Sequence, residues 1–168
     1  MSRKFKIIML ISVILLQMTV LAHFKPLGVI PNYTFVCVVV ISLISADAES
    51  VIISACAGFL TDMFTGAPLG LNTLMCMYFS IVCAIISDVI YNKSVKLMCP
   101  VGFAASFLYE LLFGIFSTLM RDRSFEIITV LLRALAIAAV NAVLFIPVFL
   151  ILKRVRFEKK RKGIKYEQ

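Results

Sequence analysis

The chain has 168 residues, of which 62% are hydrophobic and 15% charged, and its mean hydropathy is strongly positive. A soluble domain is closer to half apolar and a quarter charged, so the composition excludes an ordinary soluble protein and indicates an integral membrane protein. The formal net charge is +8, and eight of the 17 basic residues lie between Lys153 and Lys165. The charge therefore marks one basic tail rather than an evenly basic surface.

Six apolar segments are candidates for membrane-spanning helices. The hydrocarbon core of a bilayer is about 30 Å thick, and a helix needs about 20 mostly apolar residues to cross it. The second and third segments are short for this, which predicts less tilt, local thinning of the bilayer or burial within the protein. The sequence therefore predicts an all-α integral membrane protein, a bundle of about six transmembrane helices. In chain order the segments are residues 5–22, 32–46, 51–66, 71–91, 97–120 and 126–152.

The lysines and arginines outside these spans predict the orientation, because short cytoplasmic loops carry an excess of them. With both termini inside, the inner side holds three near the N-terminus, two near residue 95 and eight in the tail, against three in the outer loops. We expect a single transmembrane domain, residues 1–152, followed by a basic cytoplasmic tail, residues 153–168. The first segment has the basic start of a signal peptide, but the five further spans favour an uncleaved helix.

The stretch "GFLTDMFTGAPLGLN" places an aspartate among glycines inside this apolar chain. Ser54, Gly58, Asp62 and Gly66 recur every four residues, which puts them on one face of a helix. Small residues allow another helix to approach closely in lipid. The spacing therefore predicts that the third span packs in the bundle interior, with Asp62 turned inward.

The second half of this stretch predicts a tight outer turn between two helices. Pro68 disfavours helix at the residue before it, so the third span should end near Gly66. Gly70 gives the turn conformational freedom, and Asn72 suits the N-cap of the fourth span. The pair Pro31–Asn32 repeats this logic at the start of the second span.

Three ionisable residues, Asp62, Glu110 and Arg133, fall within predicted spans. Such residues usually face a bundle interior or a cavity and have a partner. We expect Arg133 to pair with Glu110 or Asp62, and an unpaired carboxyl to be protonated. A buried polar clasp that holds helices in register is favoured over proton or ligand binding.

The residue types that enzymes need are missing from the sequence. His23 is the single histidine, no nucleotide-binding or metalloprotease motif is present, and the five cysteines stand singly, as small hydrophobic residues do. We therefore expect no enzyme activity, no metal and no cofactor. The tail comes with no base-reading module, so it should fix the topology, or contact anionic headgroups or a cytosolic partner, rather than bind nucleic acid.

The motif resembles the hallmark of the rod shape-determining protein MreD family. Gly58, Asp62, Gly66, Leu69 and Gly70 match its pattern in order, and Pro31–Asn32 matches its Pro-Asn/Asp pair at the start of the second span. Ser54 departs mildly from the pattern, since many members carry glycine there. The chain length and the number of spans also fit.

The resemblance implies a bacterial inner-membrane protein with a fold similar to the substrate-binding subunits of energy-coupling-factor transporters. It implies a non-enzymatic scaffold of the cell-wall elongation complex (elongasome) that binds MreC and supports peptidoglycan synthesis and cell shape. Further partners would be RodA, a class B penicillin-binding transpeptidase and the MreB system. The Asp62 hairpin would form a docking groove or a core. The alternative is a small-molecule-binding subunit of an energy-coupling-factor-type transporter.

Overall fold

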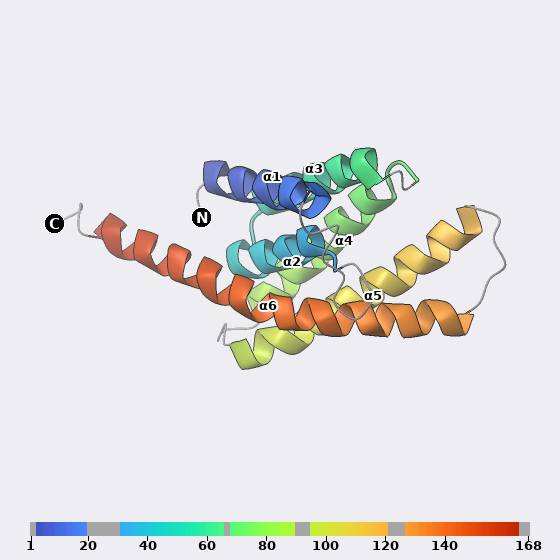
Figure 1. Cartoon of the computed structure of the whole chain (residues 1–168). Helices are drawn as coiled ribbons and strands as arrows, with labels where there is room; N and C mark the ends of the chain where they lie inside the picture. The colour runs from blue at the N-terminus through green and yellow to red at the C-terminus, as the bar shows by residue number, and fades with distance from the viewer. Residues whose placement is uncertain (1–2, 20–30, 66–67, 90–94, 121–126, 165–168) are drawn as a thin grey trace.

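The computed structural model describes residues 3–19, 31–65, 68–89, 95–120 and 127–164, which form six α-helices and no strand within these ranges (Figure 1). The predicted all-α bundle is confirmed, and five helices agree with the predicted segments to within a few residues at each described end. The sixth continues well past residue 152, so the tail begins as helix. The helices are α1 (Arg3–Thr19), α2 (Tyr33–Ser45), α3 (Ala48–Thr65), α4 (Leu71–Val89), α5 (Val95–Met120) and α6 (Ile127–Ile164).

Helix α2 is the central element of the bundle. It contacts all five other helices, and every residue from Thr34 to Ile44 is buried. A helix that is hydrophobic all round belongs in the interior of a bundle. At about 1.5 Å per residue, its 13 residues cover about 20 Å, less than the thickness of a bilayer core. Burial by the neighbouring helices thus explains the short second segment.

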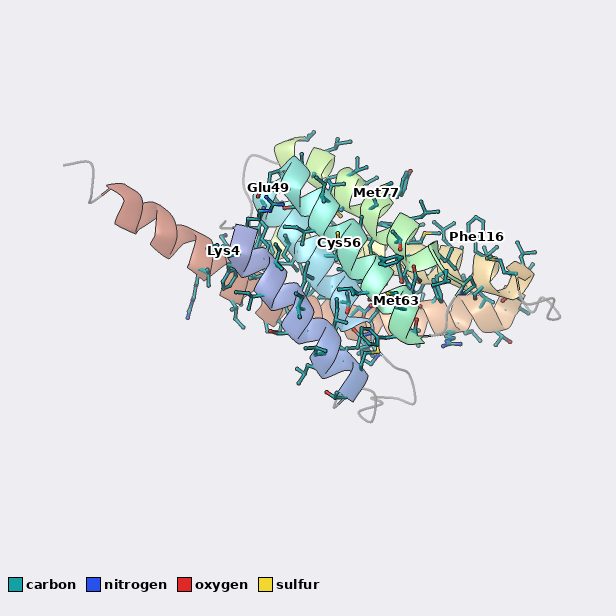
Figure 2. All side chains as sticks on the ribbon, turned by 90° about the horizontal axis from the view of Figure 1, so that it is seen from above. Lys4, Glu49, Cys56, Met63, Met77 and Phe116 are labelled. Carbon is teal, nitrogen blue, oxygen red and sulfur yellow. The ribbon has the colours of Figure 1, made fainter. Side chains whose placement is uncertain are left out.

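The other helices surround α2 in pairs. Helices α3 and α4 form one hairpin, α5 packs along α6, and α1 lies against α2 and α3. Figure 1 places the start of α1, the α2–α3 turn and the end of α6 on one side of the molecule, and the α3–α4 turn on the opposite side. The last part of α6 projects beyond the other helices in both Figures 1 and 2. Successive helices thus alternate in direction, whereas the cytoplasmic location of the termini stays a prediction.

Within the described ranges, three helical segments are long and apolar enough to cross a membrane: Ala48–Thr65, Leu97–Met120 and Ile127–Val155. Two shorter apolar helices, Tyr33–Ser45 and Leu71–Ser87, accompany them. Large apolar side chains such as Ile128 and Val143 are exposed on the outer helix faces. These faces are where a membrane protein contacts lipid.

A half-buried ion pair joins α1 to the α2–α3 turn. Lys6 is fully buried, and its Nζ donates to both oxygens of Asp47 (2.7 and 2.5 Å) and to Ser50 Oγ (3.0 Å). Asp47 also accepts from the Ser50 backbone N–H (2.9 Å), which makes it the N-cap of α3. Burial by itself raises the pKa of Asp47, but the hydrogen bonds and charge of Lys6 and the bonds from Ser50 outweigh it, so the pKa lies below its usual value.

This ion pair predicts a loss of stability in acid. A carboxyl whose pKa is lowered by folding stabilises the protein above its unfolded pKa of about 4, and this contribution disappears as the pH falls through the lower folded pKa. The thermal midpoint of the purified protein should therefore decline as the pH falls below about 4. The Lys6→Met variant should decline less over the same range. Parallel curves for the two proteins would show that Lys6 does not influence the titration of Asp47.

Candidate functional site

The side chain of Asp62, near the end of α3, closes the first turn of α4. Its Oδ2 accepts from the Gly70 N–H (3.0 Å), the Thr73 N–H (3.1 Å) and Thr73 Oγ1 (2.9 Å). Its Oδ1 accepts from the Asn72 N–H (3.1 Å), and the residue is only 1% exposed. The first N–H groups of a helix lack intrahelical partners and carry partial positive charge, which a carboxylate stabilises. Asp62 is therefore an N-terminal cap supplied by the neighbouring helix.

The close approach of α3 and α4 depends on Gly58, one turn before Asp62 on the same face. A Cβ at Gly58 would lie 2.5 Å from the Asn72 carbonyl oxygen and 2.8 Å from Thr73 Cα. Both are backbone atoms, so neither can rotate away. Ser54, Gly58 and Asp62 are all buried, which confirms the inward-facing stripe as far as the structure describes it. Gly66, the next member, lies outside the described residues.

The turn places Gly70, and not Asn72, at the N-cap position of α4. Gly70 has a φ of 92°, a left-handed conformation that glycine adopts without strain, and its carbonyl accepts from the Leu74 N–H (2.9 Å). The prediction of Asn72 as the N-cap is therefore wrong, because α4 already begins at Leu71. Gly70 has no side chain with which to cap the helix, and Asp62 takes that role.

Asn72 instead connects the hairpin to α5. Its Oδ1 accepts a hydrogen bond from the buried Tyr109 hydroxyl. The Tyr109 ring stacks on Phe35 of α2, with ring centroids 4.0 Å apart, and lies near Phe79 and Phe113. A buried tyrosine needs a partner for its hydroxyl, and Asn72 provides it. The contact thus ties α4, α5 and α2 together next to the Asp62 cap.

The Pro31–Asn32 pair reaches the same region from the start of α2. Asn32 Oδ1 accepts from the Phe35 N–H (3.0 Å), which confirms Asn32 as an N-cap. Its side chain also lies beside the Tyr109 hydroxyl, and its backbone N–H donates to Asn141 Oδ1 on α6 (3.2 Å). Pro31 is buried at this junction. The two motifs that the sequence showed separately therefore belong to one polar network between five helices.

Glu110 of α5 and Arg133 of α6 line a cavity of about 130 Å³ together with Ser117 and Thr118. No direct ion pair joins Arg133 to Glu110 or Asp62 in the described part of the chain, but Arg133 lines the same cavity as Glu110 and its charge acts on that carboxyl, so the pairing stays a prediction. Helices α5 and α6 diverge towards this end (Figure 1), and the exposed Arg133 interacts with Glu110 only across the cavity. Asp62 already accepts four hydrogen bonds from Gly70 and the first turn of α4, which stabilise its charge without a cation.

Sequence reasoning missed two functional contacts. The partner of Asn72 is Tyr109, which a tyrosine in the middle of an apolar span could have signalled, because its hydroxyl must be satisfied there. The burial of Lys6 had no comparable signal, since a basic residue near the N-terminus is equally expected to lie in the headgroup region. Its location depends on Asp47, which is 41 positions away in the chain.

Six helices with apolar outer faces and a buried polar network at one end define a multi-span helical membrane protein. The family model for the rod shape-determining protein MreD matches residues 1–155. The chain therefore belongs to the MreD family. No curated protein and no solved structure gave a significant match. The expected similarity to energy-coupling-factor subunits accordingly stays a prediction.

Proposed function

We propose that this rod shape-determining membrane protein is a non-enzymatic scaffold of the cell-wall elongation complex. It would bind MreC and thereby support peptidoglycan synthesis, together with RodA, a class B penicillin-binding transpeptidase and the MreB system. The hydrogen bonds of Asp62 support a structural rather than a chemical role for this residue, because both of its buried carboxylate oxygens accept bonds at the start of α4. Of the two expectations for the hairpin, this arrangement favours the core over a groove that docks a partner through Asp62.

The exposure of Leu69 is the observation that supports a partner-binding site at the tip of the α3–α4 hairpin. Leu69 is 76% exposed, whereas Gly58 and Asp62 of the same motif are buried. Contact with another protein would remove this exposed apolar side chain from water, and the Asp62 cap holds the start of α4 next to it. We propose that Leu69 contacts MreC on the side opposite the termini. That side would be external, with the protein in the inner membrane and both termini in the cytoplasm.

Replacement of Leu69 by serine is expected to reduce co-purification of MreC several-fold and leave the thermal midpoint unchanged. Leu119→Ser is a matched control, since Leu119 is 62% exposed at the corresponding end of α5. In cells, Leu69→Ser should reproduce part of the rounding expected when the gene is deleted. Normal MreC recovery with Leu69→Ser, or equal losses in both variants, would contradict the proposed contact.

A further inference from the structure

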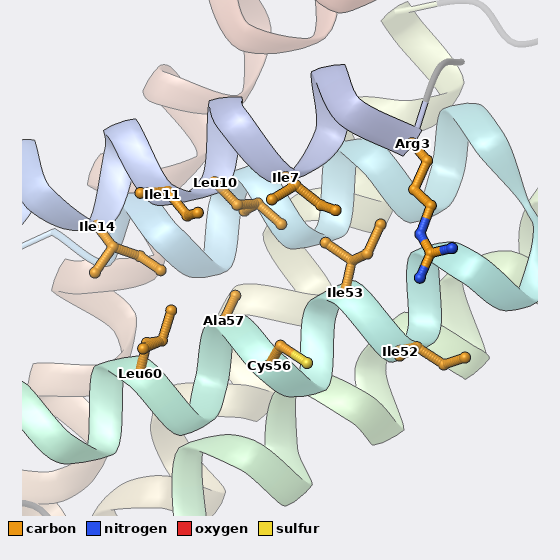
Figure 3. Close-up of a pocket in the computed structure, with 10 residues that line it drawn as sticks. All are labelled: Arg3, Ile7, Leu10, Ile11, Ile14, Ile52, Ile53, Cys56, Ala57 and Leu60. Atoms are coloured by element: carbon orange, nitrogen blue, oxygen red, sulfur yellow. The ribbon is translucent and has the colours of Figure 1, made fainter.

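An apolar groove of about 220 Å³ runs between α1 and α3 (Figure 3). Isoleucine, leucine, alanine and cysteine side chains form its walls, and Arg3 is the charged residue that lines it. Figure 3 shows the Arg3 side chain extending from α1 towards α3 at one end, with Ile14 and Leu60 at the other. The groove is therefore apolar along its length and cationic at one end.

The groove opens on the outer surface of the bundle. Ile11 and Ile52 on its walls are 43% and 63% exposed, and Cys56 is also exposed. Figure 2 shows α1 and α3 side by side on this face, where no other helix covers them. An apolar hollow holds water poorly and loses dispersion contacts if it stays empty. In a bilayer it will be occupied by something apolar.

The length of the groove fits one leaflet of the membrane. From Arg3 to Ile14 the α1 wall rises about 17 Å, at about 1.5 Å per residue. Half of a bilayer core about 30 Å thick is about 15 Å. A partner's transmembrane helix would need an apolar seam along the full thickness. The groove has the length of a single acyl chain instead.

The positive charge of Arg3 at the end of the groove favours a lipid with an anionic headgroup. Arg3 lies on the side of the molecule that bears the α2–α3 turn, and no carboxylate pairs with it in the described residues, Glu49 of the first turn of α3 included. Lys6, one turn along α1, differs because Asp47 already neutralises it. A planar guanidinium binds phosphate oxygens in a bidentate manner. The free cation is thus placed where a lipid phosphate sits.

We propose that the α1–α3 groove binds one anionic phospholipid of the leaflet on the side of the N-terminus, with an acyl chain between the helices and the phosphate at Arg3. The bound lipid completes the packing of α1, whose main contacts among the described helices are with α2 and α3. The site does not depend on the proposed MreC contact, which lies at the opposite end of α3.

The test uses the full chain in mild detergent with phosphatidylglycerol or phosphatidylcholine added, and native mass spectrometry to count bound lipids. The wild-type protein should retain one phosphatidylglycerol in preference to phosphatidylcholine. Arg3→Gln should lower this preference about fivefold, the effect of one basic residue near an anionic lipid surface. Cys56→Phe, which fills the groove from its exposed wall, should remove both lipids. Lys4→Gln, an exposed neighbour that does not line the groove, should behave as wild type.

The thermal midpoints of all four proteins show whether a variant that loses lipid is still folded. Because Cys56 is exposed, the larger side chain of Cys56→Phe should leave the fold intact. Unchanged phosphatidylglycerol binding in both Arg3→Gln and Cys56→Phe would overturn the proposal. So would equal binding of the two lipids by the wild type. Crosslinks from Cys56 to a transmembrane helix of a co-purified protein would also overturn it, because the groove would then hold a helix.

Discussion

Replacement of Gly58 by alanine is expected to lower the stability of the protein more than the same replacement at any other described glycine. The new Cβ would lie 2.5 Å from the Asn72 carbonyl oxygen, a backbone atom. Overpacking typically costs about 1–3 kcal/mol, and a rigid backbone neighbour places this site at the upper end. Separation of α3 from α4 would also draw Asp62 away from the N–H groups that it caps.

The measurement is the thermal midpoint in detergent, together with the yield of folded protein. Gly114→Ala is the matched control, because its Cβ would meet a Val130 side-chain methyl rather than backbone. Both changes gain about 1 kcal/mol of helix propensity, so their difference isolates the clash. A Gly58→Ala protein as stable as Gly114→Ala would mean that α3 and α4 do not approach as closely as described.

Replacement of Asp62 by asparagine is expected to destabilise the hairpin by about 3 kcal/mol, because charge-assisted hydrogen bonds and a helix cap are lost together. Asparagine keeps the shape and one acceptor oxygen. Its NH₂ group, however, would face N–H donors of α4 that previously had a carboxylate oxygen. At least one buried donor would then lack an acceptor, and three would if the NH₂ group took the Oδ2 position.

Native-state hydrogen exchange at Gly70, Asn72 and Thr73 would localise this loss, since their amides should exchange much faster in Asp62→Asn. Glu49→Gln serves as the control, because it makes the same chemical change at an exposed residue and should alter stability by less than about 0.5 kcal/mol. Unchanged protection of the three amides would contradict a capping role for Asp62.

The sequence predicted the helices well because hydrophobic length is a local property. It also predicted the buried face of α3, since a four-residue repeat of small residues places them on one side of a helix. The ligands of Asp62 could not be predicted in the same way. Its partners are backbone N–H groups, whose direction depends on the left-handed conformation of Gly70 and on the start of α4 at Leu71.

The distance between Arg133 and Glu110 shows a second limit. Their positions within predicted spans indicated that the two groups should interact, but not that the divergence of α5 and α6 leaves a cavity between them. The junction of Asn32, Asn72 and Tyr109 escaped prediction for the related reason that it joins three helices far apart in the sequence. Contacts of this kind depend on helix packing angles, which no short motif specifies.

The central position of α2 has a consequence for biosynthesis. The α3–α4 hairpin is closed by bonds between residues 8 to 11 positions apart, so it can assemble as soon as both helices leave the ribosome. The short α2 is different, because α6, the last helix made, forms part of its enclosure. The interior of the bundle is therefore complete only after α6 has been made, whereas the hairpin can form much earlier.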